Sequence, residues 1–96
     1  MSRTDLVISP EAELDIKEIL QYTLTTWGDD QVDAYWSIIW DSLQRIRSFP
    51  EIGKQRRHAQ EREFLLPHHI AIYRWDPQVN RVTILRIRSH RQRRKR

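Results

Sequence analysis

Apolar residues fall into two long stretches with helical spacing and several shorter runs typical of strands. In the first stretch, the residues with helical spacing are Ala12, Ile16, Ile19, Leu20, Thr23 and Trp27. The second consists of Val32, Trp36, Ile39, Leu43 and Ile46, and Tyr35, Ile38 and Trp40 widen it. Because only Gly28 and a residue or two separate the stretches, we expect an antiparallel helical hairpin.

Residues at the ends of these stretches mark where the helices begin and end. Ser9 can cap the first helix and Pro10 suits its first position, while Gly28 ends it. The second helix begins at Asp29 or Asp30 and ends at Phe49, because proline follows. Short apolar runs predict strands at 6–8, 63–66, 70–75 and 81–88, with a turn at 76–80 between the last two. In the last strand, alternation puts Val82 and Ile84 on one face, with Arg86 a further candidate, and Thr83, Leu85 and Ile87 on the other.

The order of elements predicts an α+β fold. An N-terminal strand precedes the helical hairpin, and a three-stranded antiparallel sheet follows. The basic stretch 51–61 is either a solvated loop or a partner contact. We expect one domain over residues 1–89 and a basic, flexible tail over 90–96, because that tail has too little apolar surface to offset the entropy of ordering.

Composition narrows the classes of function. The chain has 96 residues and no cysteine, which excludes a disulfide scaffold and a thiolate zinc site. No apolar run approaches the roughly 20 residues of a membrane span, and the N-terminus lacks a signal-peptide core, so we expect a cytoplasmic protein. Residues 1–41 carry nine acids and two bases, whereas residues 42–96 carry four acids and fifteen bases. Such an asymmetric distribution of charge along the sequence is typical of a protein that binds a charged partner.

A series of short motifs follows the predicted elements in order. The helical motifs are Ser9-Pro10-Glu11-Ala12, Asp15-Ile16 and Ile19 before Tyr22, Trp27-Gly28, Ala34-Tyr35, and Leu43 with Ile46 before Pro50-Glu51-Ile52-Gly53. The strand motifs are His69-Ile70-Ala71-Ile72-Tyr73-Arg74 and Val82-Thr83-Ile84-Leu85-Arg86-Ile87. With these motifs, the chain from residue 8 to about 91 resembles the ParE branch of the ParE/RelE superfamily of bacterial type II toxins. Each motif also has a structural reason to exist, so the resemblance depends on their joint order.

The resemblance implies a growth-inhibiting toxin that a cognate ParD-like antitoxin neutralises in a hetero-oligomer. ParE-like toxins are associated with poisoning of DNA gyrase, and RelE-like toxins with cutting of mRNA on the ribosome. RNA cleavage needs a general base, a cationic clamp and a general acid. A RelE-type ribonuclease is expected to carry an arginine three residues before the strand tyrosine, where this chain has Ile70. Only His90 and Arg91 remain as catalytic candidates, so binding of gyrase is the preferred activity.

Three functions therefore compete: a gyrase-binding toxin, a ribosome-dependent endoribonuclease, and a small basic nucleic-acid-binding module suggested by the Arg-rich tail. Under the first, no cofactor and no sequence-specific nucleic-acid binding by the toxin alone are expected. The target-binding candidates are Arg74, Arg86, Arg88, His90 and Arg91. The antitoxin-binding candidates are Tyr35, Ile38, Trp40, Arg56 and Arg57.

The tryptophans and histidines have structural interpretations. We expect Trp27 and Trp36 to pack in the core. Trp40 either covers a second face of its helix or contacts a binding partner. No metal site is expected at His68-His69, because neighbouring residues on a strand point to opposite faces and no acidic cluster accompanies them.

Overall fold

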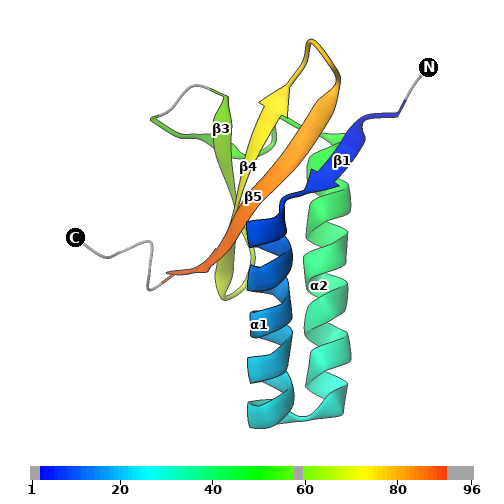
Figure 1. The fold of residues 1–96 in the computed structure, drawn as a ribbon, viewed down its shortest axis with the longest axis vertical. Coiled ribbons are helices and arrows are strands. Elements are labelled where there is room, and N and C mark those ends of the chain that lie inside the picture. The colour runs from blue at the N-terminus through cyan, green and yellow to red at the C-terminus, as the bar shows by residue number, and fades with distance from the viewer. Residues whose placement is uncertain (1–2, 58–59, 91–96) are drawn as a thin grey trace.

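The structure is a computed structural model that describes residues 3–57 and 60–90. A helical hairpin packs on one face of a twisted five-stranded sheet (Figure 1). In chain order the elements are β1 (Asp5–Ile8), α1 (Pro10–Trp27), α2 (Asp29–Ser48), β2 (Lys54–Gln55), β3 (Glu61–Leu65), β4 (His69–Asp76) and β5 (Arg81–Ser89). The strand order is β1-β5-β4-β3-β2, in which β1 runs parallel to β5 and every other pair is antiparallel.

The predicted helix boundaries are confirmed. The hydroxyl of Ser9 accepts a hydrogen bond from the Ala12 amide at 3.0 Å, and Pro10 is the first helical residue. Gly28 alone connects the two helices. Its φ of +94° lies in the region that favours glycine, and its amide donates to the Leu24 carbonyl at 3.0 Å. This one-residue connection forces the antiparallel hairpin.

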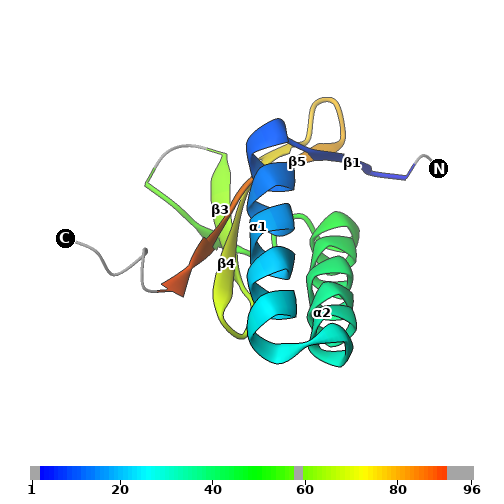
Figure 2. The ribbon, with the colours of Figure 1, turned by 60° about the horizontal axis from the view of Figure 1, so that its bottom comes forward.

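The core lies where the sheet meets one end of the hairpin. Its buried helical residues are Ala12 and Ile16 of α1 with Ile39, Leu43 and Ile46 of α2. Its buried strand residues are Ala71, Tyr73, Val82, Ile84 and Ile87. Beyond this contact the hairpin projects past the sheet (Figure 1). The two helices lie side by side along the length of the hairpin (Figure 2). Trp27 is 67% exposed and Trp36 is 39% exposed, so the prediction that both pack in the core is wrong.

A β-bulge in β5 changes which side chains share a face. Tyr73 pairs with Ile84 and Ile72 pairs with Arg86, so Leu85 is the extra residue on β5. Beyond the bulge the alternation is shifted by one position. Ile87 therefore joins Ile84 on the core face and Arg86 moves to the other, which corrects the face assignment made from the sequence.

The sheet has more strands than the three-stranded antiparallel unit predicted from the sequence. Parallel β1 joins it through β5, and β2 lies in the stretch predicted to be a loop. Strand β2 has only two exposed polar residues, so no hydrophobic pattern could reveal it. Arg56 holds this edge to β3 through its amide, which donates to the Glu61 carbonyl, and through a 3.1 Å ion pair with Glu63. The α+β class itself is confirmed. Neither helix in the described residues has the length and apolarity to cross a membrane.

Candidate functional site

The predicted target-binding arginines of the strands occupy register positions on the face of the sheet opposite the core, although the Arg86 guanidinium reaches helix α1. Directly opposed residues of antiparallel strands lie on the same face. Arg88 is paired with Ile70, Arg86 with Ile72, and Arg74 with Thr83. The core face holds the alternate residues Ala71 and Tyr73. The three arginines therefore form a row along the β4–β5 hairpin, which we call the arginine row.

Within the arginine row, Arg86 is also tied to helix α1. Its guanidinium makes two hydrogen bonds to the Asp15 carboxylate, at 2.8 and 3.1 Å, and these raise the pKa of Arg86. Asp15 also accepts the backbone amide of Ile87 at 2.9 Å. Strand β1 pairs with β5 only as far as Ile84, so Asp15 satisfies an amide on the uncovered edge. Arg86 therefore contributes to the fold whatever else it binds.

Histidines gather where β4 begins and β5 ends. The hydroxyl of Tyr35 on α2 lies 2.7 Å from Nδ1 of His69. Nε2 of His90 lies 3.1 Å from the His69 carbonyl, so that nitrogen must carry the proton it donates. Burial lowers the pKa of His69, and the neighbouring His68 and His90 lower it further. We call Tyr35, His68, His69 and His90 the histidine cluster.

The histidine cluster differs from what strand alternation predicted. The rings of His68 and His69 both lie near Tyr35, with ring centroids 6.3 and 5.5 Å away. His68 precedes the first residue of β4, so the alternation rule does not apply to it. Among the residues that the structure describes, no group of three His, Cys, Asp or Glu side chains could hold a metal ion. His90, the first residue of the predicted tail, is half-buried, whereas Arg91 lies outside the described residues.

The strand tyrosine is a structural residue. Tyr73 is fully buried, and its hydroxyl donates to the Pro50 carbonyl at 2.7 Å and accepts the Gly53 amide at 2.9 Å. Burial raises the pKa of this phenol. A Cβ on Gly53 would lie 2.6 Å from the hydroxyl oxygen, so the close approach requires glycine. Ile70, three residues earlier, is 2% exposed.

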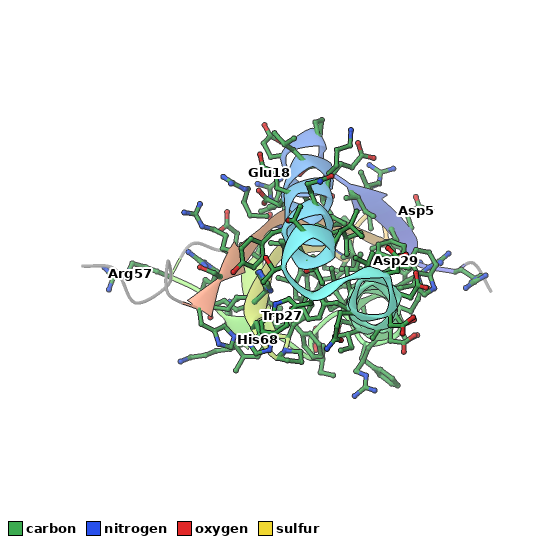
Figure 3. The ribbon with its side chains drawn as sticks, turned by 90° about the horizontal axis from the view of Figure 1, so that it is seen from below. Asp5, Glu18, Trp27, Asp29, Arg57 and His68 are labelled. Atoms are coloured by element: carbon green, nitrogen blue, oxygen red, sulfur yellow. The ribbon has the colours of Figure 1, made fainter. Side chains whose placement is uncertain are left out.

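The predicted antitoxin-binding residues do not form one surface. Tyr35 and Ile38 pack against the core, while Trp40 is 45% exposed beside Trp36, with ring centroids 5.9 Å apart. Arg56 pairs with acids of β3, and Arg57 lies far from α2 in Figure 3. Helical periodicity did not reveal the exposed tryptophan pair, because it cannot tell where the sheet stops covering the helix.

Comparison with known proteins identifies the class of protein to which this chain belongs. A family described as "ParE toxin of type II toxin-antitoxin system, parDE" matches residues 6–94. The chain therefore belongs to the ParE family, and it is a toxin of a type II toxin-antitoxin system. A search of curated protein sequences finds no match.

Solved structures share the fold at low sequence identity. A structure described as a chromosomal ParDE toxin-antitoxin system from P. aeruginosa is 16% identical, covers 91% of this chain and 96% of that one, and has a TM-score of 0.79. The RelBE2 toxin-antitoxin complex of Mycobacterium tuberculosis is 15% identical, covers 93% and 100%, and has a TM-score of 0.67. A metal-bound toxin from Helicobacter pylori is 13% identical, covers 93% and 97%, and has a TM-score of 0.57.

Proposed function

We propose that this toxin acts by binding DNA gyrase in the cytoplasm, and that a ParD-like antitoxin neutralises it in a hetero-oligomer. The arginine row supports a binding activity. Its cations are spread along two strands instead of converging on one reacting atom, which suits a broad charged interface. The binding surface would comprise Arg74, Arg86, Arg88 and His90, together with Arg91 of the basic C-terminus.

The single observation that favours binding over RNA cleavage is the environment of Ile70. An apolar, buried side chain stands where the ribonuclease branch is expected to place an arginine. It can neither neutralise a phosphorane nor move a proton. Tyr73 is equally unsuited to catalysis, because both hydrogen bonds of its hydroxyl go to the backbone.

A direct test adds the purified toxin to gyrase supercoiling and, separately, to translating ribosomes. We expect loss of supercoiling and intact mRNA. The double substitution R74Q/R88Q should weaken inhibition about tenfold, because each rim charge contributes roughly 1 kcal/mol or less. K17Q/R45Q is the matched control, since it removes two exposed cations from helices α1 and α2, on the other side of the molecule from the arginine row. Codon-specific mRNA cuts with unaffected gyrase would contradict the proposal.

One observation keeps the endoribonuclease as a second candidate. Arg88 is the cross-strand partner of Ile70 and lies on the same face, so a cation from β5 stands beside the position where β4 has none. His69 of the histidine cluster directly precedes Ile70, and His90 follows Arg88 by two residues, just past the end of β5. Arg88 would serve as the clamp and His90 as the acid or base. If so, H90A should abolish mRNA cutting, while R88K should retain part of it.

The antitoxin would bind the helical hairpin. Trp40 supplies its exposed apolar contact, whereas Tyr35 and Ile38 would act by holding the helix in place. Co-purification with the neighbouring gene product tests it. W40A should shorten the lifetime of the complex, while R57Q should mainly slow its formation. A protein that is monomeric and harmless without any partner would contradict the proposed complex.

A further inference from the structure

The helical hairpin carries a dense and unbalanced set of charges. Between Pro10 and Gln44 it exposes seven carboxylates and one ammonium group, that of Lys17. The carboxylates belong to Glu11, Glu13, Glu18, Asp29, Asp30, Asp33 and Asp41. Figure 3 looks onto the tip of the hairpin, with Asp29 at the start of α2 and Glu18 on the outer side of α1. A surface of this sign attracts cations.

An apolar groove runs between the helices inside this acidic surface. It has a volume of about 420 Å³ and is open to solvent. Its lining residues are Ile16, Leu20, Val32 and Trp36, with Glu13 and Asp33 as its acids and Lys17 as its one base. Trp40 extends the groove along α2, because its ring lies against that of Trp36. Exposed tryptophan faces beside carboxylates are a favourable site for guanidinium groups, which stack on the ring and pair with the acid.

The chain itself contains a segment of the matching chemistry. Residues 91–96, Arg-Gln-Arg-Arg-Lys-Arg, carry five cations in six positions and lie outside the described residues. We propose that this segment of a second copy of the chain docks in the groove, with arginines stacked on Trp36 and Trp40 and paired with Asp33 and Glu13. The proposal goes beyond the toxin's target and holds whether that target is gyrase or the ribosome.

The geometry favours a second copy over the chain's own segment. His90 is fixed beside His69, on the side of α2 that presents Tyr35. Trp36 is turned about 100° and Trp40 about 140° from Tyr35 around the helix. The shorter way round the helix passes Ile39 and Leu43, which are buried in the core, so an exposed segment would have to go the other way, over about 220° to Trp40 and 260° to Trp36. That path is about 21–25 Å long, whereas six extended residues span at most about 20 Å. In its own molecule the segment would fall short of the tryptophans, whereas a second copy can present all five cations.

Sedimentation of the full chain over a range of concentrations tests the proposal. We expect reversible self-association that weakens at least tenfold when salt is raised, because the contacts are mainly charged. Replacing the five cations of residues 91–96 by Gln should abolish it. The control replaces five other exposed cations by Gln, namely Arg45, Lys54, Arg57, Arg74 and Arg81, so the net charge is the same and the segment is intact. Equal loss of association in both variants would overturn the proposal.

A second measurement locates the docking site. A synthetic peptide of residues 90–96 is titrated onto the full chain carrying the Gln segment, with tryptophan fluorescence as the readout. E13Q/D33N should weaken binding about tenfold, while D30N/D41N, which removes the same charge from the outer side of α2, should change it less than twofold. Peptide binding that neither E13Q/D33N nor D30N/D41N weakens would overturn the proposal. A chain that stays monomeric while its own residues 91–96 compete with the peptide for the groove would also overturn it.

Discussion

The two ends of the helical hairpin have similar sequence patterns and opposite environments. At the end that meets the sheet, Ile16, Leu43 and Ile46 are buried, whereas the same helical spacing at the tip leaves Trp27 and Trp36 exposed. Periodicity determines which face of a helix is apolar, but the extent of the sheet determines whether that face is covered. The uncovered end therefore presents apolar side chains to solvent.

The largest expected loss of stability follows substitution at the end of the hairpin that packs on the sheet. L43A should lower the free energy of unfolding by about 3 kcal/mol, because Leu43 is fully buried and its loss leaves a cavity. W27A at the tip should change it by no more than about 0.5 kcal/mol. Urea unfolding of the two variants measures the difference. Equal losses would mean that the tip is packed as tightly as the core.

A smaller effect is expected where α1 meets β5. D15A removes the acceptor of the Ile87 amide and of the Arg86 guanidinium, so we expect a loss of about 2 kcal/mol. E18Q, one turn along the same helix on an exposed site, should cost about 0.5 kcal/mol or less. If thermal unfolding gave the same value for both, the Asp15 contacts would contribute nothing to the fold.

The histidine cluster should make stability depend on pH. The folded state lowers the pKa of His69 below its ordinary 6.5, so below that pH the unfolded chain binds more protons than the folded one. Stability from this group is therefore complete above pH 6.5 and declines as the pH falls toward the folded pKa. H69Q should flatten the decline, measured by unfolding at a series of pH values. H68Q should keep most of it, because burial is the larger cause of the shift.

The smallest expected effect concerns the hydroxyl of Tyr35. Y35F removes its hydrogen bond to His69 while keeping the ring packed against the core, so we expect a loss of about 1 kcal/mol. The ring contact alone would leave the pH dependence of stability unchanged. A change in that dependence in Y35F, read by the same unfolding series, would show that the hydroxyl also sets the titration of His69.

The sequence predicted well whatever depends on local chemistry. Ser9, Pro10 and Gly28 place the helix ends because capping and backbone freedom are local properties. Features that depend on distant contacts were missed. The bulge at Leu85 arises from pairing between β4 and β5, and β2 is held by Arg56 and acids of β3. The link between Tyr35 and His69 joins residues far apart in the chain, so no spacing could have revealed it.

The same division applies to the candidate site. The arginines of the arginine row were proposed one by one from the sequence, and their role stays a prediction, but their common face follows from strand register, which the bulge resets. The histidine cluster had only His90 as a sequence signal. Strand alternation argued against a shared metal site at His68 and His69, because both residues were assigned to the strand, whereas β4 begins at His69. Register and strand ends are set by tertiary pairing, so a single sequence cannot give them reliably.

The double substitution H90A/R91A, assayed for gyrase supercoiling and for mRNA cutting, tests the central claim most directly. It removes His90 and Arg91, the acid or base and the cation that the sequence predicts for RNA cleavage, and such groups each contribute about 10²- to 10⁴-fold in a catalysed reaction. If the toxin acts by binding, the arginine row retains most of the contact, so inhibition of supercoiling should weaken about tenfold or less and persist at higher toxin concentration. Complete loss of toxicity in this variant, with mRNA cutting by the unsubstituted chain, would contradict the account.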